Sequence, residues 1–281
     1  MSAQNHNGPE NGPETGPFSE VGRAPAITDP LSGGSRAPAI EVREVTKSFG
    51  DSEVLKGVSL DLLPGRINFI IGRSGEGKSV LLKILTGLYK PDSGSVRYGN
   101  IDLAKARPRE VDGLRLRMGL LFQEGALFDS LTVGENVVFP LWFHRLAKPA
   151  AARKKALGIL EELGLAGYGD MGVSLLSTGE KKRVALARAL IVDPEVVFFD
   201  EPTTGLDPLL SSQVDGLIVH AQKASKATVV VVSHDMAATL SLADRVTLLR
   251  QGRVVLSGSP DEFRASRDPE VINFLSGGES P

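Results

Sequence analysis

The fold of this chain is decided by one stretch, Gly72-Arg73-Ser74-Gly75-Glu76-Gly77-Lys78-Ser79. It fits the pattern G-x-x-x-x-G-K-[ST] and lies between an apolar run at 67–71 and a predicted helix at 79–88. In that context the glycines let backbone N–H groups approach phosphate oxygens, and the helix start adds about half a positive charge. Lys78 is placed to reach the β- and γ-phosphates of a nucleotide, and Ser79 to coordinate Mg²⁺. We therefore predict a phosphate-binding loop rather than a simple glycine-rich turn.

Two carboxylates end a second apolar run, Val196-Val197-Phe198-Phe199-Asp200-Glu201. A buried strand that ends in two acids needs a reason, because burying charge is costly. Beside the phosphate loop, Asp200 would hold Mg²⁺ through water, and Glu201 would polarise the attacking water as general base. Without the upstream loop, an ordinary solvated strand end would be the better interpretation of this pair.

Further polar residues follow predicted strands. His234 comes after the run 229–232, and Gln123 after the run 118–122. Ligands bind at the carboxyl edge of open α/β sheets, so His234 is a candidate γ-phosphate contact and Gln123 a candidate contact of the metal or the water. Phe49 is a candidate for stacking on adenine, and its alternative is a core aromatic.

A helix start led by serine, Ser177-Thr178-Gly179-Glu180, follows Leu176. Alone it would be ordinary. The phosphate loop upstream and the acidic strand end downstream change this, because the three features in this order are typical of one kind of ATPase. We expect its four residues to contact nucleotide phosphates.

The chain alternates predicted strands with predicted helices, which indicates an α/β core with a largely parallel sheet. Between about 131 and 175 the pattern becomes helical and interrupts the core. The expected strands are 40–45, 58–62, 67–71, 118–122, 196–199 and 228–232, with a hairpin of 246–249 and 254–257; the expected helices are 79–88, 150–163, 180–191, 208–222 and 236–243.

Composition sets bounds on the function. The 281 residues carry a net charge of −2, which gives no argument for nucleic acid, and the lack of cysteine excludes disulfides. No secretory signal is expected, and the most apolar runs, 137–143 and 227–232, are too short to span a bilayer. A role at a membrane therefore requires a partner. Residues 1–39 are rich in Gly, Pro, Asn and Ser and are predicted to be a disordered tail.

These residues together resemble the ABC ATPase family, from about residue 40 to about 257. The resemblance implies an α/β fold: a P-loop NTPase with an ABC-type mixed sheet core, an antiparallel β subdomain and an inserted α-helical subdomain. It implies a domain at 40–258 with the helical subdomain at about 124–178, and a short helical segment and tail at 259–281. The matching motifs are Walker A at 72–79, the Q-loop Gln123, the signature 176–180, Walker B at 196–200 with catalytic Glu201, the D-loop Gly205-Leu206-Asp207 and the switch His234.

The signature departs from the family pattern Leu-Ser-Gly-Gly-Gln, since Thr178 and Glu180 replace a Gly and the Gln. Ser177 and Gly179 remain, so we expect an altered rate or affinity rather than inactivity. In the family the signature of one subunit closes on the ATP of the other. The resemblance therefore implies a head-to-tail homodimer that binds ATP and Mg²⁺ between its two copies.

The sequence is also similar to a narrower group, the Mce-associated or Mla-type phospholipid transport ATPases. The similar segments include 72–83, 121–130, Asn136 to Pro140 and 268–275. This implies a permease of the MlaE type, an Mce-domain substrate-binding protein and a STAS-domain regulator as partners. It also implies a location on the cytoplasmic face of the inner membrane. The apolar stretch Ala126-Leu127-Phe128 would receive the permease, and core packing is its alternative.

Two other functions stay open. The chain could serve a different ABC transporter, for another lipid, a lipoprotein or a small solute. Some ABC ATPases act in DNA repair or on ribosomes instead, but these carry paired ATPase modules or long coiled-coil insertions, and the sequence shows neither. Its basic residues form no stripe suited to nucleic acid.

Overall fold

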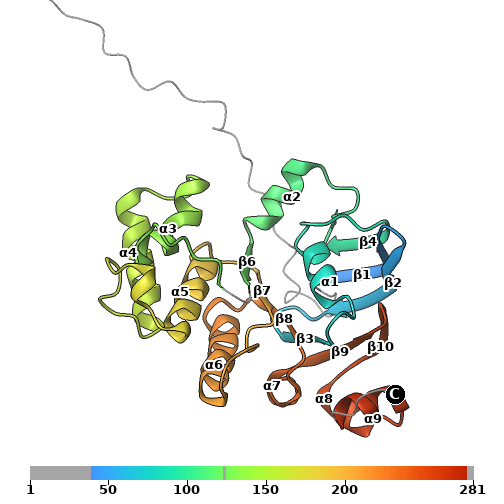
Figure 1. Ribbon diagram of the computed structural model, residues 1–281. Coiled ribbons are helices and arrows are strands. Elements are labelled where there is room, and N and C mark those ends of the chain that lie inside the picture. The colour runs from blue at the N-terminus through green and yellow to red at the C-terminus, as the bar shows by residue number, and fades with distance from the viewer. Residues whose placement is uncertain (1–38, 123–124, 277–281) are drawn as a thin grey trace, which may run out of the picture.

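Two β-sheets with helices around them make up the computed structural model, which describes residues 39–122 and 125–276 (Figure 1). The larger sheet has the order β10-β9-β3-β8-β7-β6 and is parallel except for β10. Its strands are β3 (Ile67–Ile71), β6 (Met118–Leu121), β7 (Val196–Asp200), β8 (Thr228–Ser233), β9 (Arg245–Arg250) and β10 (Arg253–Gly258).

The smaller sheet is antiparallel, with the order β2-β1-β4-β5. Its strands are β1 (Ile40–Phe49), β2 (Ser52–Leu62), β4 (Ser93–Tyr98) and β5 (Ile101–Asp102). The predicted α/β fold, with a mixed sheet and an antiparallel β subdomain, is confirmed. The two predicted strands of this subdomain, 40–45 and 58–62, are parts of longer strands because they pair with each other along a hairpin.

Helix α1 (Lys78–Leu85) packs between the two sheets. Its apolar side chains, such as Leu81 and Leu85, share one core with β1 and β2 above and with one face of the larger sheet below. The helix ends earlier than the predicted 79–88, since Gly87 takes a positive φ of 70°. Because α1 begins directly after the loop that follows β3, this packing fixes the loop on the sheet.

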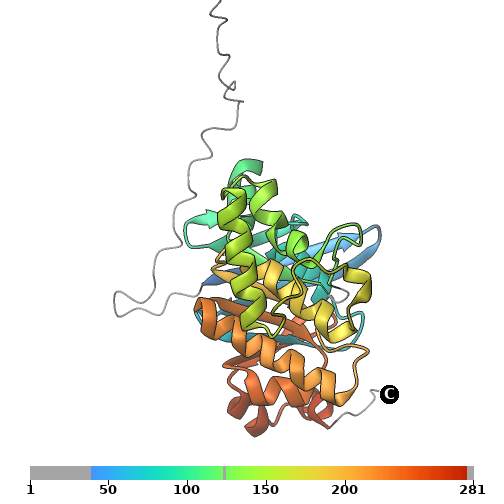
Figure 2. The same cartoon turned by 90° about the vertical axis from the view of Figure 1, so that its left-hand side faces the viewer.

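On the opposite face of the larger sheet pack helices α5 (Thr178–Leu190) and α6 (Pro208–Ser225), and α3 (Val133–Phe143) and α4 (Pro149–Glu162) pack in turn on α5. Figure 2 looks onto this side, with the helices in front of the strands. In β7 the side chain of Phe198 packs in the core shared with α1, and those of Val197 and Phe199 pack in the core on the opposite face of the sheet. This burial on both faces explains why the strand reads as a continuous apolar run.

The remaining helices are α2 (Pro108–Arg115), the 3₁₀ turn Val173–Leu175, α7 (Met236–Leu242), α8 (Pro260–Ala265) and α9 (Pro269–Leu275). Helices α3, α4 and α5 form a lobe beside the sheets (Figure 1). The domain boundaries at 40, 124, 178 and 258 stay predictions, and most of the expected tail lies outside the described residues.

Candidate nucleotide-binding site

The phosphate loop lies between β3 and α1 and is shaped by close backbone contacts. Gly77 precedes the helix with φ 98°, and a Cβ there would lie 2.8 Å from the Cδ2 of Leu55. A Cβ on Gly72 would lie 2.4 Å from the carbonyl oxygen of Leu249 in β9. Both positions therefore require glycine. Gly77 needs it for its positive φ and close packing, and Gly72 needs it because two backbone segments approach each other there.

Lys78 points back into the loop rather than outward. Its side chain is 5% exposed, and its Nζ donates to the carbonyl oxygens of Gly72 at 2.8 Å and Arg73 at 2.9 Å. The same Nζ lies 3.2 Å from Oε1 of Glu201, whose side chain is 15% exposed. The cation is thus fully engaged by the protein's own groups, at the place where phosphates would bind.

The acidic pair reaches this loop from the end of β7. The Ser79 hydroxyl donates to Oδ1 of Asp200 at 3.5 Å. Burial raises the pKa of the Asp200 carboxyl above its usual value, and the nearby charge of Glu201 raises it further. A cation beside this carboxylate would offset both effects. One hydroxyl and one carboxylate oxygen fit part of a Mg²⁺ shell, which takes its other ligands from water and phosphates.

Glu201 is held by three neighbours at a strained backbone position. Its φ is 45°, in the left-handed region, and its N–H donates to Val232 of β8 at 2.9 Å. Its Oε2 lies 2.7 Å from Nδ1 of His234 and accepts from the Thr204 hydroxyl at 3.1 Å. Strained positions cluster at functional sites. Thr204 was missed from the sequence, although its place in the turn three residues after Glu201 was the available signal.

The serine-led helix start forms a separate polar cluster. Ser177 caps α5 and accepts from the N–H of Glu180, while Oε2 of Glu180 accepts from the Ser177 N–H at 2.8 Å and from its hydroxyl at 2.7 Å. Oε1 of Glu180 accepts from the Tyr168 hydroxyl at 2.9 Å. The hydroxyl of Ser177, first among these donors, lowers the pKa of Glu180. Thr178 is exposed, and Gly179 packs near Leu210 of α6, where a Cβ would be 3.2 Å from its Cδ2.

Phe49 ends β1 and is 45% exposed. The ring centroid of Phe49 lies 5.6 Å from that of Tyr89 and 5.5 Å from Nζ of Lys47. The structure therefore favours a ring at the surface over a core aromatic. Gln123 lies outside the described residues.

Two residues that sequence reasoning did not single out hold the loop that follows Gln123. Arg188 of α5 donates to the carbonyl oxygens of Gly125 at 2.7 Å and Ala126 at 2.8 Å. Asn136 of α3 is fully buried, accepts from the N–H of Phe128 and donates to three carbonyl oxygens, that of Phe128 among them. An Asn in an apolar helical run was the signal for the second, since a buried amide needs partners.

Comparison with known proteins decides the family. The family described as "ABC transporter" matches residues 55–204 of this chain. The chain belongs to the ABC transporter family. It is an ATP-binding subunit with the ATPase activity typical of these proteins.

Several curated relatives cover most of the chain. The intermembrane phospholipid transport system ATP-binding protein MlaF of Haemophilus influenzae is 37% identical over 85% of this chain and 90% of its own length. The chloroplastic protein TRIGALACTOSYLDIACYLGLYCEROL 3 of Arabidopsis thaliana is 41% identical over 85% of this chain and 73% of its own length. The probable ribonucleotide transport ATP-binding protein mkl of Mycobacterium leprae is 36% identical over 88% of this chain and 72% of its own length.

Solved structures of ABC subunits share the fold. The cassette MJ0796, seen as a dimer in a post-hydrolysis state with ADP and Pi, superposes with a TM-score of 0.70 at 32% identity, over 79% of this chain and 98% of its own. The subunit cbiO1 of Clostridium perfringens, part of the ABC transporter complex cbiONQ, superposes with a TM-score of 0.74 at 30% identity, over 85% and 99%. Each described helix of the present chain is too short or too polar to cross a membrane.

Proposed function

We propose that this protein hydrolyses ATP to move phospholipid or another lipid between membranes, as the motor subunit of a membrane transport complex. The observation that carries the ATPase part is the meeting of Lys78, Asp200, Glu201 and His234 at one edge of the larger sheet. The lipid part rests on similarity to MlaF, whose name states intermembrane phospholipid transport.

Each group at this edge has a role suited to its chemistry. Lys78 leaves its carbonyl partners and Glu201 to bind the β- and γ-phosphates, along with the N–H groups of the loop 72–79. Glu201 accepts the proton of the attacking water. His234 orients that carboxylate through its 2.7 Å contact and faces the γ-phosphate. Phe49 stacks its exposed ring on adenine.

Magnesium belongs to the same site. Ser79 and Asp200 would hold Mg²⁺, with Gln123 as a third candidate ligand, and the ion would neutralise charge on the β- and γ-phosphates. Only one of the three is ionised, so the residues fit an ion that binds mainly through nucleotide and water.

The active form is a head-to-tail dimer of two copies. Ser177, Thr178, Gly179 and Glu180 of one copy contact the ATP held by the loop 72–79 of the other. The exposure of Ser177 and Thr178 at the start of α5 leaves them open to a partner. The related cassette MJ0796 is dimeric in a post-hydrolysis state bound to ADP and Pi.

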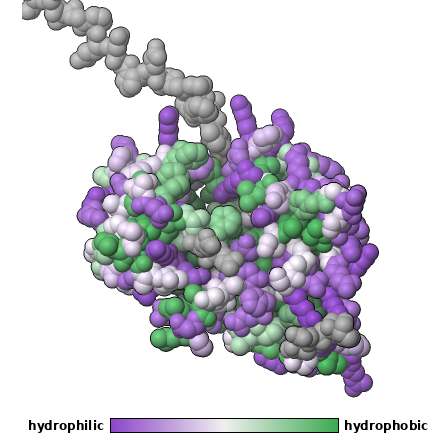
Figure 3. All heavy atoms as spheres, in the orientation of Figure 1, coloured by the Kyte–Doolittle hydropathy of each residue, from purple (hydrophilic) through white to green (hydrophobic). Residues whose placement is uncertain are grey.

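The permease binds beside the loop that follows Gln123. Phe128 in this loop is 42% exposed, and its ring centroid lies 4.6 Å from that of Phe139, which lies 5.8 Å from that of Phe143. A groove of about 200 Å³ lies next to them, between the edge strand β6 and helices α3 and α5. Hydrophobic side chains also reach the surface of the helical lobe in Figure 3. A helix of an MlaE-type permease fits this apolar border.

The complex would be completed by an Mce-domain substrate-binding protein and a STAS-domain regulator. The chain itself would lie on the cytoplasmic face of the inner membrane, held by its permease. Its near-neutral net charge of −2 offers no attraction to nucleic acid.

Capture from solubilised membranes tests the proposal. The tagged chain should copurify a polytopic membrane protein with bound lipid, identified by mass spectrometry. Phe128→Asp should abolish capture, and Ile272→Asp, at an exposed apolar position on α9, should not. A homodimer with full ATPase activity and no membrane partner would refute the transport role. Loss of ATP binding in Lys78→Ala tests the phosphate loop separately.

A second cargo is favoured by one relative. The mycobacterial protein mkl is named as a probable ribonucleotide transport protein at a similar level of identity. Lipid analysis of the captured complex separates the two cargoes. A complex free of lipid whose ATPase is stimulated by ribonucleotides, and not by phospholipid, would favour the second.

A further inference from the structure

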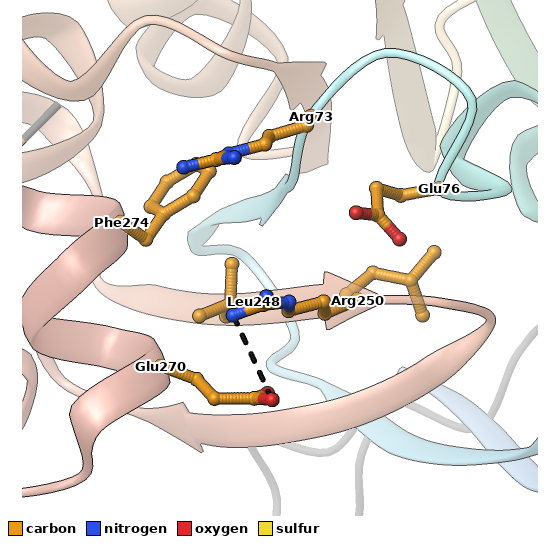
Figure 4. A pocket seen from close by; sticks show the side chains of 7 residues that line it. Arg73, Glu76, Leu248, Arg250, Glu270 and Phe274 are labelled. Atoms are coloured by element: carbon orange, nitrogen blue, oxygen red, sulfur yellow. Dashed lines mark ion pairs between the residues drawn. The ribbon is translucent and has the colours of Figure 1, made fainter. Parts of the chain in front are cut away.

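A small pocket joins the phosphate loop to the C-terminal helix. It is lined by Arg73 and Glu76 of the loop, by the end of β9 with Arg250, and by Glu270 and Phe274 of α9 (Figure 4). Its volume of about 10 Å³ is room for at most one water. The pocket is therefore a packed joint between two parts of the chain and not a ligand site.

Helix α9 is itself fixed on the sheet. Val271 is 1% exposed and belongs to the main core, against which Phe274 and Leu275 also pack. Nη1 of Arg250 lies 3.6 Å from Oε1 of Glu270, the ion pair drawn in Figure 4. The helix can thus act as a rigid support for whatever rests on it.

The phosphate loop meets the end of β9 at two points and α9 at a third. Gly72 approaches the carbonyl of Leu249 so closely that no Cβ fits there. Glu76 accepts a hydrogen bond from the backbone N–H of Gln251, directly after β9. The guanidinium of Arg73 lies toward the ring of Phe274 across the pocket (Figure 4).

Arg73 also contacts the phosphate-binding lysine. The carbonyl of Arg73 accepts the hydrogen bond from Lys78 at 2.9 Å. Arg73 therefore carries both the side chain that reaches the pocket and the carbonyl that holds the phosphate-binding lysine. The Arg73 side chain extends toward α9, and nothing in the sequence between 73 and 274 signals that contact.

We infer that Phe274 of α9 is a positioning residue for ATP binding, acting on the phosphate loop through Arg73. The inference rests on the proposed role of the loop 72–79. It adds that the C-terminal helix holds the loop in its binding shape, so that the residue acts on nucleotide affinity and not on the hydrolysis step. The attraction of a cation to an aromatic ring at a partly exposed site corresponds to about a three- to fivefold change in binding.

The test compares variants of the full-length chain by ATP titration and steady-state kinetics. Phe274→Leu, which keeps an apolar side chain, should raise the dissociation constant and the KM for ATP about three- to fivefold, with kcat within about twofold. Phe274→Tyr should restore the affinity. Ile272→Ala, at a 49% exposed position on the same helix, should change nothing. A fall in kcat with unchanged KM, or an equal effect of the Ile272 change, would overturn the inference.

A double-mutant cycle identifies the route. Arg73→Gln and Phe274→Leu should each weaken ATP binding, and the double variant should be little weaker than Arg73→Gln alone. Fully additive effects would show that Phe274 does not act through Arg73. Lys78→Ala in the same assay distinguishes a failure of this inference from a failure of the proposed phosphate-binding site. If it loses ATP while Phe274→Leu binds normally, the inference fails and the proposed site stands; if it binds ATP normally, the site itself is refuted.

Discussion

Glu201→Gln tests whether the ion pair between Lys78 and Glu201 competes with ATP for the lysine. Nζ of Lys78 lies 3.2 Å from Oε1 of Glu201, and both side chains are largely buried. The phosphates of ATP need the same cation, so binding must give up this ion pair. Glutamine keeps the shape and the hydrogen bond but removes the charge. We therefore expect the variant to bind ATP more tightly than the wild type.

The magnitude follows from the geometry. At 3.2 Å and an effective dielectric constant of about 20, the Coulomb attraction is about 5 kcal/mol, most of which is offset by desolvation of the pair. The difference between a charge-assisted and a neutral hydrogen bond is about 1–1.5 kcal/mol. ATP affinity should therefore rise about five- to tenfold. Loss of the general base should also slow turnover by about 10²- to 10⁴-fold.

The assay is titration of ATP by calorimetry, in EDTA, at two protein concentrations. An increase in ATP affinity that comes from loss of the ion pair is the same at both protein concentrations. An increase that comes from a trapped dimer grows with protein concentration. Lys78→Ala is the control, because it removes the cation for which ATP and Glu201 compete. Equal or weaker binding of the dilute Glu201→Gln protein would refute the reasoning. Unchanged turnover would remove Glu201 as the base.

Other variants test further parts of the site and fold. Glu180→Gln weakens the acceptor that holds the Ser177 hydroxyl at 2.7 Å, so steady-state ATPase at low protein concentration should rise about threefold, and an equal or lower rate would contradict this. Asn136→Leu removes four hydrogen bonds from a buried amide and should destabilise the fold by about 3 kcal/mol, or about 6–12 °C in a thermal melt; an unchanged melt would count against it. Asp215 has a buried oxygen without a hydrogen-bond partner among the described residues, and burial, with Asp235 nearby, raises its pKa. Its ionised form therefore costs stability as pH rises through the folded pKa, so Asp215→Asn should be more stable than wild type in urea at pH 7, with the gain gone below pH of about 4.

The sequence was sufficient for the layout of the sheet edge. Parallel strands end at the same edge, so polar residues after the strands 67–71, 196–200 and 228–233 had to lie together. The α/β class followed from the same alternation. The roles of the individual site residues stay predictions, although the structure brings Lys78, Glu201 and His234 into contact.

Contacts between distant segments were beyond the sequence. The packing of α9 near Arg73 depends on where the last helix lies on the sheet. The end of α1 at Leu85 was misjudged because an apolar residue, Leu88, continues the helical pattern beyond the glycine that breaks it.

In this structure both halves of the site make contacts with internal partners. Lys78 is bound by two carbonyls and Glu201, and the Ser177 hydroxyl is bound by Glu180. ATP would replace the first set when it binds and, in the proposed dimer, the second set when another copy closes on it. Moving such an equilibrium from 1:99 to 99:1 takes about 5.5 kcal/mol of differential binding. Exchanging the Lys78–Glu201 pair costs only about 1–1.5 kcal/mol of hydrogen-bond energy, which phosphate and metal contacts can exceed. The internal partners therefore hold these groups in place without preventing ATP from binding. In the proposed dimer, hydrolysis would remove the γ-phosphate from between the copies and return each group to the partners in its own subunit.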